Sequence, residues 1–398
     1  MRISNFNRFA TTVDTLQARQ AELTRAQEQL SSGKRIAVPS DDPTAAARAE
    51  RAFISQQRIT SSQRAVDYSR NAMKLAESAL GQVGDVLQGV RESLVAAGNG
   101  SYGPGERVAL AKQLTQLRAQ LLAQANQSDG AGGHVFGGQG ASSAPFLDTA
   151  AGVSFAGTGG QVQLSTSEDL PLSLDGQSLW LHAASGNGTY VSGAAAANTG
   201  SGWIDAGGVS DPSALTGADY SVDFSVAAGV TTYSVLKAGS PTALSGVPYV
   251  AGQAITVDGM SFHIAGAPAN GDSFTLQPSA PDLDPFETLD RAIAVLNNPA
   301  SNSGQVQQVV SSGVRDIDAV ASRMQTARSA AGASLQHLDA MDSRNQDRQL
   351  LAKSVQSDAE DLDMVQAVSD FQTKQTSYQA ALQSYAMVHR LSLFDYIK

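Results

Sequence analysis

The chain ends in Leu391-Ser392-Leu393-Phe394-Asp395-Tyr396-Ile397-Lys398, which closes a run of more than fifty residues without proline or glycine. Such a run predicts a long helix. Within it, mostly apolar residues recur in alternating steps of four and three, the spacing of a heptad seam. A lone helix in water cannot bury such a seam, so we expect it to pack against another helix. The seam consists of Met364, Val368, Phe371, Gln375, Tyr378, Leu382 and Tyr385.

The amino-terminal end of the chain supplies a matching helix. It is expected from residue 5 to Leu30 and should stop at Ser31-Ser32-Gly33, where glycine can take the left-handed cap conformation. Neither end has an obvious partner elsewhere in the chain, so we expect the ends to pair with each other or with copies, and to be disordered before assembly. The same alternation of steps runs through Phe9, Val13, Leu16, Gln20, Leu23, Gln27 and Leu30.

Three glutamines interrupt the two seams. Gln20, Gln27 and Gln375 stand where leucine would bind more tightly. Polar seam residues can fix the register of a helix pair at a cost in stability, which is one hypothesis for their role. The alternative is that they face solvent at a slightly different helical phase.

Glycine and proline divide the chain into three parts. Of 37 glycines, 26 lie between Gly130 and Gly271, whereas no proline occurs from residue 44 to 103 or from 300 to 398. Helical segments therefore flank a β-type insert. We expect an α+β multidomain fold whose long helical coiled-coil and bundle core is formed by both termini. The predicted domains are a terminal helical coiled-coil domain (1–42 and 345–398), a helical bundle domain (43–144 and 283–344) and an inserted antiparallel β domain (145–282).

Two long rods are predicted in the bundle. Ser40-Asp41-Asp42-Pro43 reads as a helix start, because an acid can accept the free amides and proline suits the first turn. Apolar residues then recur every seven positions up to residue 97, which at about 1.5 Å per residue makes a rod roughly 80 Å long. The second rod is expected over 303–342, with a bend at 342–345, and shorter helices over 106–127 and from residue 285. The repeats are Ile59, Val66, Met73, Leu80, Leu87 and Leu94, and Val310, Ile317, Met324, Ala331 and Leu338.

The insert alternates apolar and polar residues in twos, which is typical of strands. Tyr220, Val222, Phe224 and Val226 should share a strand face, and 178–182 is interpreted as another strand. A hairpin is predicted over 255–264, because Asp258-Gly259 suits a primed two-residue turn.

The net charge of -10 is concentrated in the insert. Residues 145–282 hold eleven acids and one base, Lys237, so this segment alone carries 1 − 11 = −10. An acidic insert argues against nucleic acid or anionic lipid as a partner and favours a solvated outer surface. No apolar run approaches the roughly 20 residues that span a membrane, and the first residues lack the apolar stretch of a cleaved signal peptide.

Little in the sequence indicates catalysis. The chain has no cysteine, its five histidines are scattered, and it lacks a G-x-S-x-G elbow, so we expect no catalytic site, cofactor or metal. A catalytic triad formed by residues that are distant in sequence stays an alternative. Gly130-Ala131-Gly132-Gly133 is an incomplete dinucleotide fingerprint, which we interpret as a turn. Glu360, Asp361 and Asp363 crowd one helix turn, for which the alternatives are a divalent-cation site and a solvated helix face, and the solvated face is favoured.

Several motifs resemble those of the bacterial flagellin family. Leu30-Ser31-Ser32-Gly33-Lys34-Arg35-Ile36 with Pro39-Ser40-Asp41-Asp42-Pro43 resembles the family's amino-terminal signature, and His134-Val135-Phe136-Gly137-Gly138 its aromatic-glycine turn. The carboxyl-terminal ending resembles the branch that joins the hook to the filament. The resemblance covers roughly 1–140 and 284–398 but not the insert. It adds to the seams an interface at Leu391, Leu393, Phe394, Tyr396 and Ile397, and a link motif at Gly33, Arg35, Ser40, Asp41, Asp42 and Pro43.

The resemblance implies a structural adaptor of the flagellum rather than an enzyme. It implies export of the unfolded chain through the flagellar channel, help from an export chaperone, and a ring of copies with the terminal helices inward and the insert outward. The expected neighbours are a hook-associated protein on the hook side and flagellin or a further junction protein on the filament side. The alternatives are a filament-forming flagellin and, in a different class, a secreted adhesin or enzyme acting through the insert.

Overall fold

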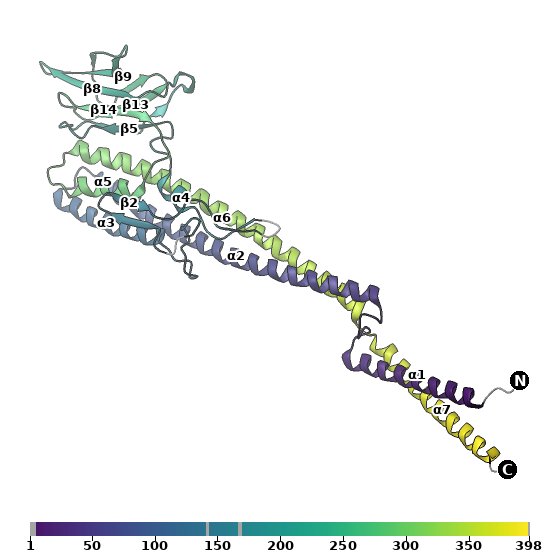
Figure 1. Cartoon of the computed structure of the whole chain (residues 1–398). Helices are drawn as coiled ribbons and strands as arrows, with labels where there is room; N and C mark the ends of the chain where they lie inside the picture. Colours follow the sequence, from purple (N-terminus) through teal and green to yellow (C-terminus); the bar gives the residue numbers. More distant parts are fainter. Residues whose placement is uncertain (1–4, 141–142, 166–168, 397–398) are drawn as a thin grey trace. The chain divides into compact units, whose positions relative to one another are not determined.

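The computed structural model describes residues 5–140, 143–165 and 169–396, with only the backbone described for 5–9, 165 and 388–396. The chain divides into two compact units, 1–64 with 340–398 and 65–339. Figure 1 shows the order of elements: helices flank a β-rich segment, which confirms the predicted α+β class. The three-part domain division stays a prediction. Among the described residues, no helix combines the length and apolarity needed to cross a membrane.

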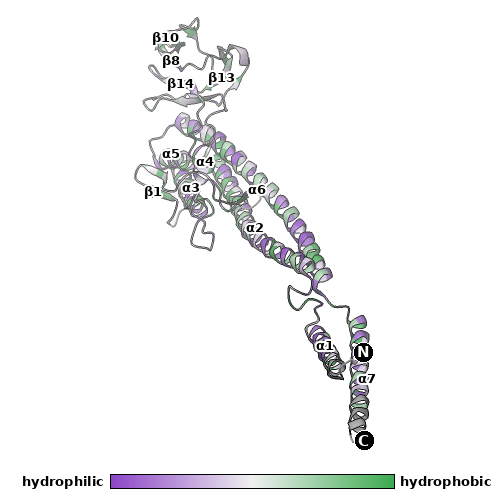
Figure 2. Ribbon diagram, turned by 45° about the vertical axis from the view of Figure 1, so that its right-hand side comes forward, coloured by the Kyte–Doolittle hydropathy of each residue, from purple (hydrophilic) through white to green (hydrophobic). Residues whose placement is uncertain are grey.

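Four helices build the core of the unit formed by 65–339. These are α2 (Pro43–Ala97), α3 (Pro104–Ala125), α5 (Pro285–Asn297) and α6 (Ser303–Glu360), of which α2 and α6 continue into the other unit. Figure 2 shows hydrophobic and hydrophilic residues mixed along α2 and α6, as expected of helices with one apolar stripe. Every repeat residue of the two predicted rods from Val66 onward is buried: Val66, Met73, Leu80, Leu87, Leu94, Val310, Ile317, Met324, Ala331 and Leu338.

The first part of the predicted insert belongs to this helical core. Phe146, Trp180 and Phe286 are fully buried, and the Trp180 ring stacks on Phe286 at 5.9 Å between centroids. The expected strand over 178–182 is wrong, because these residues form helix α4 (Gly176–Leu181). Asp175 caps it by accepting a hydrogen bond from the Ser178 amide at 3.3 Å. A five-residue pattern does not separate a strand from one helical turn. The short hairpins beside it are β1 (Phe146–Thr149) with β2 (Gly152–Phe155) and β3 (Gln163–Ser165) with β4 (Asp169–Pro171).

The rest of the insert is an antiparallel β domain with its own core. One six-stranded sheet has the order β10-β9-β8-β14-β5, with β11 also pairing β9, and a second has the order β12-β13-β6, with β7 pairing β13. The inward faces of both sheets supply buried aromatic and branched residues. The strands are β5 (Tyr190–Ala194), β6 (Trp203–Ile204), β7 (Gly208–Val209), β8 (Tyr220–Ala227), β9 (Val230–Lys237), β10 (Ser240–Pro241), β11 (Val247–Pro248), β12 (Ala254–Val257), β13 (Met260–Ala265) and β14 (Ser273–Pro278), with the short helix η1 (Pro212–Ala214) between β7 and β8.

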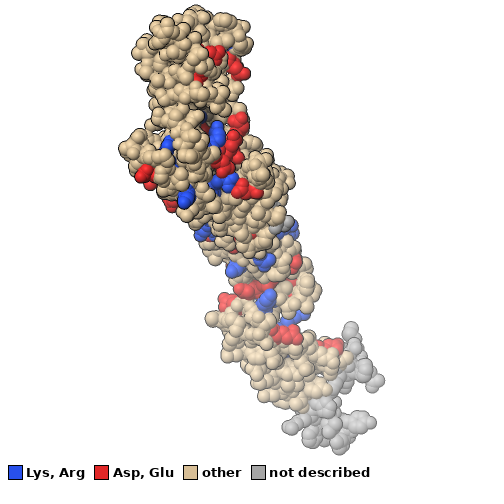
Figure 3. Space-filling model, turned by 90° about the vertical axis from the view of Figure 1, so that its left-hand side faces the viewer, with Lys and Arg blue, Asp and Glu red and all other residues tan. Residues whose placement is uncertain are grey.

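Two predictions for this domain are confirmed. β12 and β13 form the hairpin, and Asp258 and Gly259 both have the positive φ angles, 42° and 77°, of a primed turn. Tyr220, Val222 and Phe224 are buried on one face of β8, and the face reaches water at Val226. Figure 3 shows acidic side chains on the β domain, whereas Lys and Arg gather along the helices.

The other unit holds α1 (Asn5–Ser32), α7 (Met364–Tyr396) and the ends of α2 and α6. The expected bend at 342–345 is wrong, since α6 runs unbroken to Glu360 and the chain turns at 361–363. The polar residues that suggested a bend are bound across to α2. The Gln63 amide donates to Asp342, and the buried Asn345 donates to the Gln63 carbonyl oxygen at 3.1 Å. Satisfied polar groups of this kind fit inside a helix pair.

We expect Trp180→Ala to destabilise the unit formed by 65–339 by about 3–5 kcal/mol, because it removes a fully buried ring and leaves a cavity among Phe136, Phe146 and Phe286. Urea unfolding followed by circular dichroism measures the change. Tyr68→Ala is the matched control, since that ring is 67% exposed on α2 and should change stability by less than about 0.5 kcal/mol. Equal effects of the two substitutions would contradict the packing described here.

Candidate assembly interface

The predicted link motif joins α1 to α2 and is tied to the end of α6. Gly33 has a φ of +69°, which ends α1, and its amide donates to Gln29 O at 2.9 Å. The Arg35 amide donates to Glu360 O at 2.6 Å, and its guanidinium to Ala359 O at 2.9 Å. The Leu362 amide donates back to Gly33 O at 3.0 Å. The turn after α1 and the turn after α6, which are distant in sequence, are therefore joined by hydrogen bonds.

A charge pair reinforces this junction. Lys34 Nζ lies 2.7 Å from Glu360 Oε2, and the hydrogen bond with Glu360 raises the pKa of Lys34. Both side chains keep contact with water, so the pair adds modest stability and mainly fixes geometry.

Asp41 and Asp42 have separate roles in the link. The Asp41 carboxylate accepts hydrogen bonds from the Ala37 and Val38 amides at 3.1 Å each, which closes the loop before α2. Asp42 Oδ1 accepts from the Ala45 amide at 3.0 Å and caps α2, with Pro43 in its first turn. The Ala45 hydrogen bond, with that from the Thr44 hydroxyl, holds the pKa of Asp42 below its ordinary value. Ser40 is exposed.

The crowded acids at the end of α6 also divide into separate roles. Glu360 pairs with Lys34, whereas Asp363 accepts hydrogen bonds from the Val365 and Gln366 amides at 3.0 and 3.1 Å and caps α7. Within the described ranges, no group of three or more His, Cys, Asp or Glu residues could hold a metal ion. The cap at Asp363 was not predicted, although an acid just before an apolar-periodic run is its usual signal.

The predicted seams bring α1 and α7 into contact without forming a core. The Arg19 guanidinium donates to Ser377 O at 3.2 Å across the pair. The only buried side chain among those described in the two helices is Ala26. Seven seam residues are half-buried: Val13, Leu16, Leu23, Leu30, Phe371, Tyr378 and Tyr385. Large apolar side chains of α7 remain in water, with exposed fractions of 48% for Met364, 85% for Val365, 42% for Val368, 42% for Leu382 and 61% for Met387.

The remaining predicted interface residues are placed only in part. Gln20, Gln27 and Gln375 are exposed, which favours the solvent-facing alternative for the pair within a single chain. The side chains of Phe9, Leu391, Leu393, Phe394 and Tyr396 lie outside the described set, as does Ile397 altogether.

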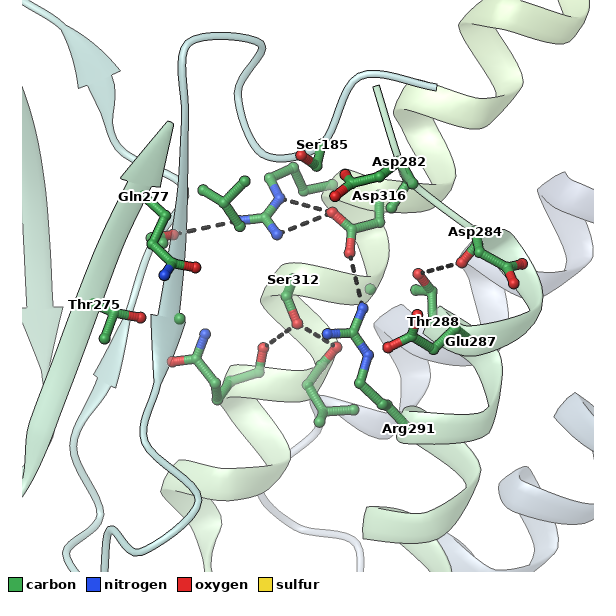
Figure 4. Close-up of a pocket in the computed structure, with 18 of the residues that line it drawn as sticks. Ser185, Thr275, Gln277, Asp282, Asp284, Glu287, Thr288, Arg291, Ser312 and Asp316 are labelled. Carbon is green, nitrogen blue, oxygen red and sulfur yellow. Dashed lines mark hydrogen bonds and ion pairs between the residues drawn. The ribbon is translucent and has the colours of Figure 1, made fainter. Parts of the chain in front are cut away.

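A polar cavity of about 580 Å³ lies between the β domain and helices α5 and α6 (Figure 4). The buried Asp316 carboxylate meets Arg315 at 2.9 Å and Arg291 at 3.7 Å. Burial raises the pKa of Asp316 and of Asp284 above their ordinary values. Arg315 also reaches Ser192 Oγ on β5 at 3.3 Å. Because these charges pair with one another, we interpret the cavity as part of the attachment of the β domain to α6.

Comparison with known proteins extends the resemblance over nearly the whole chain. Residues 3–141 match the bacterial flagellin N-terminal helical region. Flagellar hook-associated protein 3 of Escherichia coli is 26% identical over 385 residues, which cover 95% of this chain and 94% of that protein. The protein of the same name from Salmonella typhimurium is 38% identical over 148 residues, 37% of this chain and 46% of its own length.

A solved structure decides the family. The crystal structure of FlgL from Xanthomonas campestris is 32% identical, covers 71% of this chain and 93% of its own, and superposes with a TM-score of 0.65. The chain belongs to the FlgL family. Its insert, which the sequence motifs left unassigned, matches over 194–278 the D2-like domain of flagellar hook-associated protein 1. These matches do not favour the filament-forming flagellin or the adhesin and enzyme alternatives for this FlgL-family chain.

The cap of α2 generates a pH-dependent prediction. The pKa of Asp42 in the folded chain lies below its value of about 3.9 in the unfolded chain. The stability that the ionised Asp42 cap contributes is therefore complete above the unfolded pKa and is lost as the pH falls through the folded pKa. We expect the Thr44 and Ala45 amides of the native chain to lose protection from hydrogen exchange only as the pH falls through the folded pKa of Asp42, which lies below that of a free aspartate. Asp42→Asn should remove this pH step while retaining a cap.

Asp42→Ala should expose both amides at every pH. The matched control is Asp85→Ala, an exposed acid in the middle of α2 for which the structure gives no hydrogen bond or ion pair. Unchanged protection in Asp42→Ala would show that Asp42 does not cap the helix.

Proposed function

We propose that this protein is a structural adaptor that joins hook to filament in the bacterial flagellum by self-assembly of α1 and α7. The carrying observation is that these helices pair yet bury only Ala26 among their described side chains. The family is that of proteins named for the hook and the flagellar junction. The adaptor binds and positions neighbours, and the proposal gives it no catalytic step.

The energetics favour completion of the pair by other copies. Fully burying a leucine or methionine side chain stabilises by about 1.5–3 kcal/mol, so covering five half-exposed to exposed apolar side chains of α7 is worth on the order of 5 kcal/mol per copy. That gain is absent in a dilute single chain. Ordering two helices of 28 and 33 residues costs conformational entropy, and a pair without a core does not offset that cost. Folding of the ends and assembly are thus coupled.

The rest of the proposal concerns neighbours and export. Copies of the chain form a ring, with a hook-associated protein on the hook side and flagellin or a further junction protein on the filament side. The chain is secreted unfolded through the flagellar channel, and an export chaperone covers its apolar ends beforehand. The acidic β domain faces water, which suits a surface of like charge.

Removal of residues 364–398 should abolish addition of purified subunits to hook-capped seeds, because α1 then has no helix to complete its seam. Sedimentation of labelled subunits with the seeds measures addition. The matched variant lacks strands β5 to β14 instead, with 186–279 replaced by a short Gly-Ser linker, and should still add. Normal addition by the chain lacking 364–398 would overturn the proposed function.

Backbone amides of α1 and α7 should exchange with solvent rapidly in dilute monomer, whereas those of α2 between 65 and 97 should be protected, since that stretch lies in the helical core. Protection of α1 and α7 should appear after addition to seeds. Full protection of both helices in the monomer would contradict coupled folding and assembly.

A further inference from the structure

An open groove of about 500 Å³ runs between α2 and α6 in the unit formed by 1–64 and 340–398. Its floor is apolar, formed by the buried Ala52 and Ala352 and by the half-buried Ile59. Its walls carry four arginines and no carboxylate: Arg48, Arg51, Arg58 and Arg348. The charge of the groove is therefore of one sign.

These arginines are available for a partner. All four are exposed, and none makes an ion pair within the part of the chain that the structure describes. The apolar side chains beside them are also in water. Leu351 and Val355 on α6 line the groove and are 65% and 40% exposed. An apolar surface with a charged border of one sign is the mark of an interaction site.

The start of α7 has the complementary character. Residues 354–371 contain five acids and no base. Asp361 and Asp363 stand just before the helix and are exposed. Met364, Val365 and Val368 follow in its first turns and are 48%, 85% and 42% exposed. An apolar patch headed by carboxylates matches a groove with an apolar floor and arginine walls.

One chain does not bring these two surfaces together. Both remain exposed in it, with Leu351 65% and Val365 85% exposed, and the turn at 361–363 separates α6 from α7. We propose that the groove of one copy binds the start of α7 of the next copy, in a head-to-tail contact between Arg48, Arg51 and Arg58 and the acids at 361 and 363. This inference rests on the proposed self-assembly and names the partner surface within it.

A head-to-tail contact has a geometric consequence. Two different surfaces of the same chain meet, so the contact is heterologous and repeats from copy to copy until a ring closes. A two-fold symmetric dimer would instead pair the groove and α7 of the same two copies reciprocally and leave neither surface free for a third copy. Addition of successive copies to a seed therefore distinguishes the ring from an isolated pair.

The absence of cysteine from the chain permits a clean cross-linking test. Two variants, Leu351→Cys and Val365→Cys, are mixed, added to hook-capped seeds and oxidised. We expect a disulfide-linked dimer in the mixture and little in either variant alone, because only the mixture places one thiol in the groove and the other on the neighbouring α7. In the matched control, Val230→Cys takes the place of Val365→Cys in the mixture and should give no dimer. Val230 lies on β9, and its side chain is 56% exposed.

A charge reversal supplies the second arm. Arg51→Glu with Arg58→Glu should slow addition to seeds by about tenfold, and the native rate should fall as salt rises. Lys74→Glu with Lys112→Glu reverses the same charge at exposed sites away from the groove and should leave the rate unchanged. Normal addition of native subunits without a mixed dimer, or equal effects of the two double reversals, would overturn the groove contact alone. Failure of native subunits to add would overturn the proposed function itself.

Discussion

The constraint on which this molecule depends is that α1 and α7 contact each other but, among their described side chains, bury almost nothing between them. A helix pair gains stability by removing apolar side chains from water, and here the described seam residues stop at half-burial. The same residues that fail to complete a core in one chain are those that neighbours could cover. Marginal stability of the ends is therefore a property that assembly can use, because each added copy supplies the missing surface.

The link between α1 and α2 shows how helices with little side-chain packing can still begin at defined positions. Gly33, Arg35 and Leu362 exchange backbone hydrogen bonds that join the end of α1 to the end of α6. Asp42 and Asp363 cap the helices on either side, α2 and α7. Caps and backbone hydrogen bonds are short and directional, so they define where the helices begin even when side-chain packing contributes little.

The β domain is attached by polar groups rather than by a shared apolar core. The Gln308 side chain on α6 accepts from the Ile204 amide at 2.9 Å, and Asn302 donates to Gly200 O at 3.0 Å. A Cβ at Gly304 would stand 2.5 Å from the Ser201 carbonyl, so glycine permits the close approach there. The two apolar clusters of the unit, one helical and one of strands, stay separate. A domain held in this way can vary in sequence while the helices beneath it keep their packing.

The sequence by itself determined the helical rods and the hairpin at Asp258-Gly259, because seven-residue repeats and positive-φ turn residues are local signals. It also placed both terminal seams and the family motifs. Tertiary structure decided that α6 continues through 342–345, since Gln63 satisfies Asp342 and Asn345 across the helix pair and removes the reason for a bend. It also assigned Trp180 to the helical core rather than to a strand, because a ring buried against Phe286 depends on a residue more than a hundred positions away. Periodicity records which side of an element is apolar, but the neighbour that covers that side is fixed only when distant segments meet.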